Sequence, residues 1–245
     1  MKRVIGAAAG IDYFKRERNL PVEAVLSNGR GLFTDKVSPI EFASRVIDIV
    51  RNEGDVGLAR INTALDGSSP ATFEVPESEI NAAFKSLDPA SINALELAAD
   101  RVQIFQSKGL PKSWSDGAGQ FGERVTPLGS VAAYVPAGTA PLASTVIMTV
   151  VPAKVAGVEK IIVATPASGD SMPHPAVLAA AKIAGASRVF KLGGAQAIAA
   201  LAYGTETVPS VDLICGPGSA WVTAAKKLVY GDVGIDGLYG PTETL

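Results

Sequence analysis

The chain has 245 residues, of which 47% are hydrophobic and 19% charged, proportions typical of a globular protein with room for two modest domains. Its formal net charge of −2, with lysines and arginines scattered along the chain, argues against a nucleic-acid partner. The single cysteine, Cys215, excludes an internal disulfide, and the longest apolar runs, such as 146–151, are too short to cross a membrane. We therefore expect a cytoplasmic protein.

The first half of the chain is predicted to be mainly helical. Residues 1–36 are polar and glycine-punctuated, which predicts an N-terminal arm rather than a core element. Ser38-Pro39 places an N-cap and a first-turn proline at the start of the first helix. The elements expected from there to Gly109 are helices over 38–54 and 55–65, a strand over 71–75, and helices over 76–87 and 88–108.

The composition changes near residue 127. Glu123-Arg124-Val125 beside Pro127 predicts a β segment and a hinge. After Gly129, four apolar β runs alternate with four helical runs. The strands are expected near 130–135, 160–165, 188–192 and 211–215, and the helices near 144–156, 175–184, 195–203 and 219–229.

This alternation predicts an α/β fold, because continuous Val/Ile strands spaced by helices are typical of a parallel sheet covered on both faces. We expect a Rossmann-like parallel-sheet domain over 128–236. A mixed, mainly helical N-terminal domain over 1–127 precedes it and is incomplete. Residues 237–245 begin a return into that first domain and leave an apolar face uncovered there.

Three glycine turns are expected at the carboxyl ends of strands, around Gly138, Gly193-Gly194 and Gly216. Open α/β sheets bind ligands at this edge, where a turn from strand to helix exposes backbone N–H groups. Taken singly, each glycine is better explained as a tight turn, but three in one sheet favour a binding crevice. No predicted strand is followed by G-x-G-x-x-G, so a nucleotide would be held in another way.

Chemically reactive residues are sparse. His174, the only histidine, lies in a proline-bounded loop without acidic neighbours, which favours a surface position over a catalytic base or metal ligand. Cys215 is interpreted as a small core residue, with a depressed thiol pKa near a helix N-terminus as the alternative. One histidine and one cysteine cannot build a zinc site unaided. The residues by themselves indicate a binding platform without an evident catalytic group.

Several blocks of the second half, in this order, closely resemble the histidinol dehydrogenase family: 133–148, 152–157, 193–207, 211–212, 216–218 and 240–243. The resemblance implies a zinc-dependent enzyme that uses NAD in two successive oxidations of an amino alcohol, through an aldehyde, to the carboxylate. The specific reaction implied is L-histidinol to L-histidine via histidinal, in histidine biosynthesis. Members of the family work as intertwined homodimers.

The resemblance also carries site residues across. Tyr134 and Gln196 match the family's NAD-contacting Tyr and Gln, and Ser219 stands where the family usually has Asn, which shortens that contact. Thr242 matches the substrate-contacting serine of the Gly-Pro-Ser-Glu motif, and Ser144 matches a serine near the substrate.

The family's zinc ligands and its Glu-His acid/base pair follow the Gly-Pro-Ser-Glu motif, beyond Leu245. No catalytic or metal-binding residue is therefore expected within this chain, and the 245 residues alone are expected to be inactive. The substitutions at Ser219 and Thr242 leave oxidation of another polar alcohol, such as a sulfonated diol, as an alternative. Two further alternatives are a natural truncated, non-catalytic nucleotide-binding or interaction module, and an enzyme with Cys215 as nucleophile, as in aldehyde dehydrogenases.

Overall fold

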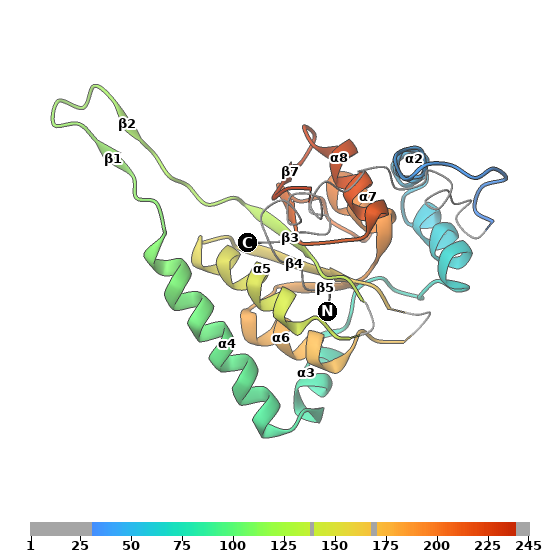
Figure 1. Cartoon of the computed structure of the whole chain (residues 1–245), viewed down its shortest axis with the longest axis horizontal. Helices are drawn as coiled ribbons and strands as arrows, with labels where there is room; N and C mark the ends of the chain where they lie inside the picture. Colours follow the sequence, from blue (N-terminus) through green and yellow to red (C-terminus); the bar gives the residue numbers. More distant parts are fainter. Residues whose placement is uncertain (1–30, 138–139, 168–170, 239–245) are drawn as a thin grey trace, which may run out of the picture.

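The computed structural model describes residues 31–137, 140–167 and 171–238. Its centre is a five-stranded parallel sheet in the order β5-β4-β3-β6-β7 (Figure 1). The strands are β3 (Ser130–Tyr134), β4 (Lys160–Thr165), β5 (Arg188–Lys191), β6 (Leu213–Cys215) and β7 (Gly234–Ile235). The chain proceeds from β3 outward to β5 and then crosses back, so that β6 lies on the other side of β3. This reversal creates a switch point between β3 and β6.

Two helices cover each face of the sheet, as the sequence predicts. They are α5 (Ala143–Val155) and α6 (Pro175–Ala184) on one face, and α7 (Gly194–Tyr203) and α8 (Ala220–Val229) on the other. Residues of β3 alternate between the two cores, because successive side chains of a strand point to opposite faces. Ala132 and Tyr134 pack with α7 and α8, whereas Val131 and Ala133 pack with α5 and α6.

The N-terminal helices form an outer layer on both sides (Figure 1). They are α2 (Pro39–Asp66), which packs on α7 and α8, and α3 (Glu77–Ser86) and α4 (Pro89–Lys108), which pack on α5 and α6. This part of the chain is mainly helical, as predicted. The domain boundaries at 127/128 and 236/237 stay predictions.

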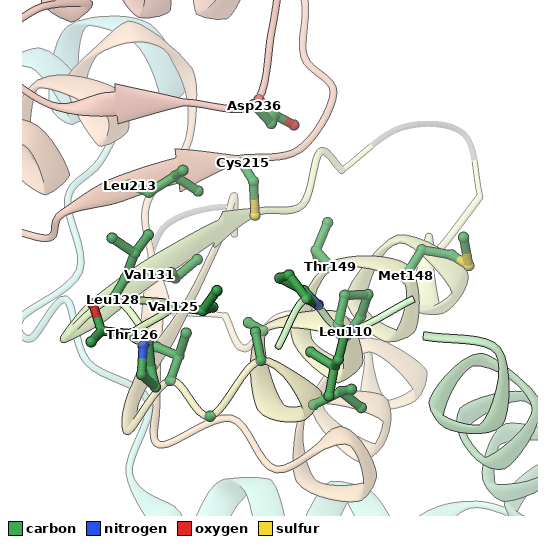
Figure 2. Close-up of a pocket in the computed structure, with 18 of the residues that line it drawn as sticks. Leu110, Val125, Thr126, Leu128, Val131, Met148, Thr149, Leu213, Cys215 and Asp236 are labelled. Atoms are coloured by element: carbon green, nitrogen blue, oxygen red, sulfur yellow. The ribbon is translucent and has the colours of Figure 1, made fainter. Parts of the chain in front are cut away.

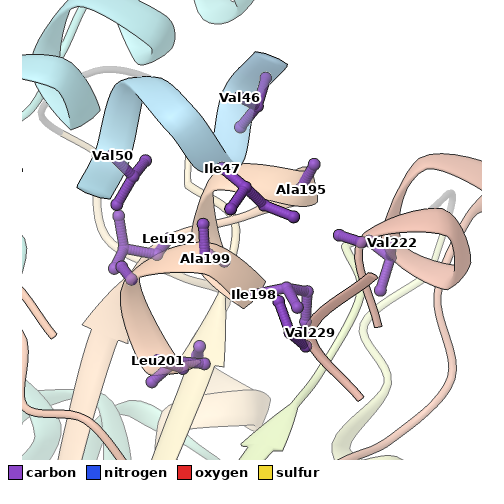
Figure 3. Close-up of a cluster of buried hydrophobic side chains, with 14 of the residues drawn as sticks. Val46, Ile47, Val50, Leu192, Ala195, Ile198, Ala199, Leu201, Val222 and Val229 are labelled. Atoms are coloured by element: carbon purple, nitrogen blue, oxygen red, sulfur yellow. The ribbon is translucent and has the colours of Figure 1, made fainter. Parts of the chain in front are cut away.

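Packing of α2 buries one apolar stripe against the sheet's own helices. Figure 3 shows Val46, Ile47 and Val50 of α2 facing Ala195 and Ala199 of α7. The small alanine side chains let the two helices approach closely. Each fully buried valine or isoleucine contributes about 1.5–3 kcal/mol relative to an exposed one. This contact therefore holds α2 against α7 and the sheet beneath it.

The boundary predicted between the first two helices appears as a kink inside α2. Gly54 has φ 55° and ψ −133°, outside the helical region. An added Cβ there would collide with the carboxylate of Glu206. That carboxylate accepts a hydrogen bond from the backbone N–H of Asp55 at 2.7 Å, and so caps the second half of the helix. The hydrogen bond from Asp55 to Glu206, which lies between α7 and β6, thus stabilises the kink.

The strand predicted over 71–75 is reduced to a bridge between Glu74 and Phe190, on the edge of β5. Val75 N–H donates to Val189 O, and Lys191 N–H donates to Phe73 O, so the pairing is antiparallel and short. The Glu74 carboxylate, which pairs with Arg188 at 2.6 Å, fastens the segment to the sheet.

The elements predicted after Gly129 lie within two residues of their observed ends. The hinge region contains a projecting hairpin of β1 (Trp114–Ser115) and β2 (Gly122–Glu123), so the predicted β segment is shifted slightly toward the N-terminus (Figure 1). Strand β7 was not predicted, because Gly234-Ile235 lacks an apolar run. Among the described helices, none has the length and apolar character that a bilayer crossing requires.

Candidate functional site

The candidate site lies at the switch point, where turns follow β3 and β6 at the carboxyl edge of the sheet. Gly216, directly after β6, has φ 111°, a conformation that favours glycine. An added Cβ would collide with the carbonyl oxygen of Tyr134, the last residue of β3. The loop after β6 therefore lies directly against the end of β3. The turn at Gly138 is outside the described residues.

Tyr134 connects this edge to the start of α7. Its side chain is buried, and its hydroxyl accepts a hydrogen bond from the Gly194 N–H at 3.1 Å. Burial raises the pKa of the Tyr134 phenol above its usual value, so the group keeps its proton at neutral pH. A protonated hydroxyl that already accepts one hydrogen bond can still donate one to a ligand.

Gln196 follows in the first turn of α7 and is only 2% exposed. Its Nε2 donates to Oδ1 of Asn62, on α2, at 3.2 Å, and within the described part of the chain its Oε1 has no hydrogen-bond partner. An unsatisfied buried acceptor costs about 1–3 kcal/mol. Such an atom requires an explanation, and a ligand that donates a hydrogen bond supplies one.

Asn62 is a site neighbour that sequence reasoning missed. It lies on the second half of α2 and is 5% exposed. On an amphipathic helix an asparagine is normally a surface residue, so the sequence carried no signal for its burial.

Ser219 and Ser144 both stand where helices begin at the carboxyl edge. Ser219 is the N-cap residue of α8, and its side chain makes no capping hydrogen bond. Ser144 lies in the first turn of α5. Thr242 is outside the described residues. The structure thus gathers Tyr134, the start of α7 and the start of α8 at one edge, with Ser144 on a separate helix that begins at the same edge.

A charged pair that the sequence patterns did not single out lies behind the loop after β6. Lys226, on α8, is 2% exposed, and its Nζ donates to the Gly216 carbonyl oxygen at 3.0 Å and to Asp236. Asp236 follows β7, and its Oδ2 accepts the Gly216 N–H at 2.7 Å. A sequence signal existed, because Lys226 lies on the same helix face as Val222 and Val229.

An apolar cavity of about 660 Å³ opens on the other face of β6, between α5 and residues 110–128, and Asp236 is among the residues that line it (Figure 2). Leu110, Met148 and Leu213 contribute to its walls, and Cys215 lies near one end. Burial raises the pKa of the Cys215 thiol to about 12. This direction contradicts the alternative of a depressed thiol pKa, because burial and the negative charge of Asp236 outweigh the positive charge of Lys226. A protonated thiol is a poor nucleophile.

The described residues do not fit a metal ion. Among them no group of three or more His, Cys, Asp and Glu side chains could hold one. His174 is exposed, as predicted, and its Nδ1 accepts a hydrogen bond from the Ala176 N–H at 3.1 Å, which caps α6. The described part of the chain therefore supplies no ligand set for zinc.

These features define a class of protein. A parallel sheet in the order β5-β4-β3-β6-β7, with helices on both faces and a turn-lined edge at the switch point, is a doubly wound, Rossmann-like α/β protein. Ligands of such proteins bind in the crevice at that edge.

Comparison with known proteins gives the family. The histidinol dehydrogenase family model matches residues 34–245. A histidinol dehydrogenase from Deinococcus radiodurans is 47% identical over 100% of this chain and 56% of its own length, and one from Thermus thermophilus is 50% identical over 88% of this chain and 51% of its own length. The crystal structure of histidinol dehydrogenase from Elizabethkingia anophelis has a TM-score of 0.79 at 29% identity, over 91% of this chain and 53% of that chain. This chain therefore belongs to the histidinol dehydrogenase family, as its sequence blocks predicted, and spans about half the length of the curated relatives it matches.

Proposed function

We propose that the protein containing this chain oxidises L-histidinol to L-histidine via histidinal, and that this chain supplies the NAD-binding part. The observation that carries the proposal is the family match, which runs through the residues gathered at the switch point. NAD, when bound, would accept the hydride that leaves the alcohol carbon. The enzyme would act in the cytoplasm, with zinc as the family's metal.

The described residues fit a dinucleotide. The unpaired Oε1 of Gln196 can accept a hydrogen bond from a ligand, and the Tyr134 hydroxyl can donate one. The N-terminus of α8, at Ser219, presents backbone N–H groups and the positive end of the helix dipole, which favour a phosphate. In this proposal Ser144 and Thr242 contact the substrate.

We further propose that the protein is a homodimer. An apolar strip runs along the outer face of α4 and onto the hairpin, and its members are Leu97, Ile104, Phe105, Trp114 and Phe121. Phe105 is 75% exposed, and the rings of Trp114 and Phe121 stack edge to face 6.1 Å apart. Exposed apolar side chains gathered in this way are typical of a protein interface.

Sedimentation tests the homodimer. The unaltered protein should be dimeric, and Ile104→Glu/Phe105→Glu should be monomeric because it places two charges in the interface. Val56→Glu is the control, since Val56 is equally exposed but lies on α2. A monomeric unaltered protein contradicts the proposal.

The first measurement is the intact mass of the protein from its source. A mass well above the 25.1 kDa of this chain directs the search for zinc and acid/base residues to the additional polypeptide. A mass of 25.1 kDa favours the binding-only alternative.

The second measurement is NADH formation from L-histidinol by the full-length protein that contains this chain, with zinc present. Absence of NADH contradicts the histidinol assignment, and NADH formed from a sulfonated diol instead supports the alternative substrate. Titration of NAD against the fluorescence of Trp221, in the first turn of α8, tests nucleotide binding separately from turnover.

A further inference from the structure

The Lys226–Asp236 pair holds both polar groups of one backbone residue. Lys226 Nζ donates to the Gly216 carbonyl oxygen, and Asp236 Oδ2 accepts the Gly216 N–H. Lys226 and Asp236 also contact each other through Nζ and Oδ1. The side chains are 2% and 24% exposed, so the pair is largely shielded from water. Gly216 is therefore held from both sides by opposite charges.

The geometry of α8 explains how Lys226 reaches this position. Side chains of a helix lean toward its N-terminus, and four methylene groups carry the lysine ammonium back over the preceding turns. Val222 and Val229 lie on the same buried face. The methylene groups of the lysine thus occupy the place of an apolar side chain in the core. The ammonium group lies beside Gly216, in the loop that precedes the helix.

Stability alone does not account for this pair. A buried ion pair is often no more stabilising than apolar residues of similar volume, because both charges must be removed from water. A valine or methionine at 226 would fit the buried face without that cost. The pair is better explained by the conformation that it specifies.

That conformation links β6, β3 and α8. Gly216 has φ 111°, and its Cα lies so close to the Tyr134 carbonyl that no side chain fits between them. Pro217 and Gly218 then lead directly to Ser219, the N-cap of α8. A displacement of Gly216 would move the N-terminus of α8 relative to the end of β3.

We propose that Lys226 and Asp236 are positioning residues of the dinucleotide crevice. They hold Gly216 against Tyr134 and thereby set the place of the α8 N-terminus and of Ser219. Neither residue contacts the ligand; both act through the loop. The inference rests on the proposed function, because the ligand is the NAD proposed above.

The test compares Lys226→Met, Asp236→Asn and the double variant with the unaltered protein. The double variant removes both charges of the pair together, so it keeps the test valid if a single variant fails to fold. Lys227→Met is the matched control, because Lys227 lies next along the same helix and is exposed. The readouts are the NAD Kd by calorimetry and hydrogen exchange of the peptide covering 213–219.

We expect the double variant to keep its circular dichroism and the exchange protection of β3 and β4. It should lose exchange protection over 213–219, and its Kd for NAD should rise at least tenfold. The Kd of Lys227→Met for NAD should stay within twofold of that of the unaltered protein. In the active enzyme, the KM for NAD should rise while the KM for the alcohol stays unchanged. A general loss of structure would raise both.

A folded double variant with unchanged loop protection and a Kd within twofold overturns the inference and leaves the proposed function intact. An unaltered protein that ignores NAD overturns the proposed function and the dinucleotide part of the inference. In that case the exchange over 213–219 still decides whether the pair holds the loop.

Discussion

The hydroxyl of Tyr134 accepts a hydrogen bond from the backbone N–H of Gly194 at 3.1 Å, which joins the end of β3 to the start of α7. The two residues are 60 positions apart in the sequence. Gly194 itself has φ 65°, a conformation that favours glycine, at the point where α7 begins. The two turns of the candidate site are thus coupled by one bond.

Tyr134→Phe should weaken both the fold and NAD binding. It leaves the partly buried Gly194 N–H without an acceptor, and an unsatisfied buried donor costs about 1–3 kcal/mol. Urea unfolding and NAD titration measure the two effects. Tyr203→Phe is the control, because Tyr203 also ends in a hydrogen bond, to Asp232 at 2.8 Å, but lies at the far end of α7. Equal NAD affinities of the two variants would contradict a role for Tyr134 in NAD binding.

Gln196 should contribute to NAD binding rather than to stability. The double variant Asn62→Leu/Gln196→Met removes the unpaired acceptor together with its partner. We expect its free energy of unfolding to equal or exceed that of the unaltered protein, because an unsatisfied buried acceptor costs about 1–3 kcal/mol. Its NAD affinity should fall. Asn62→Leu alone should be less stable, since it leaves the Gln196 amide fully unpaired. Unchanged NAD affinity of the double variant would sink the assignment of Gln196.

Gly216→Ala should be more damaging than Gly231→Ala. The two glycines have φ 111° and 110°, so alanine meets the same backbone strain at both, about 1–3 kcal/mol. The added Cβ meets nothing within 4 Å at Gly231 but collides with the Tyr134 carbonyl at Gly216. The difference between the two free energies of unfolding therefore isolates the close approach of the loop to β3. Equal losses of unfolding free energy in the two variants would show that Gly216 does not lie tightly against the Tyr134 carbonyl.

Cys215 should resist alkylation. Burial raises the pKa of its thiol from 9.0 to about 12, so at pH 8 the thiolate fraction is about a thousandfold lower than for an unperturbed thiol. Iodoacetamide labelling followed by mass spectrometry checks this, with the urea-unfolded protein as the control.

The same thiol gives a defined pH dependence. Because its pKa is higher in the folded than in the unfolded state, its contribution to stability is fully present below pH 9 and is lost as the pH rises toward 12. Cys215→Ala should remove this alkaline component and leave activity unchanged. Loss of activity in that variant would restore the nucleophile alternative.

The contrast between β4 and the segment 71–75 shows where sequence reasoning worked and where it failed. Lys160–Thr165 was predicted with its observed ends, because a continuous apolar run between a glycine-bearing turn and a proline is a local signal. Residues 71–75 have strand-forming side chains too, yet they meet only the outer edge of β5 and form one bridge. Strand length there depends on the partner, which the segment itself does not encode.

By itself the sequence determined the βα alternation, the ends of its elements and the family, because apolar runs, caps and glycine turns act over a few neighbouring residues. Tertiary structure alone decided the contacts that shape the crevice. Gln196 meets Asn62 across 134 residues, and Lys226 and Asp236 close on Gly216 only because β7 pairs with β6. Such contacts, like the raised pKa of Cys215, depend on which segments the folded chain brings together and on how much water it excludes.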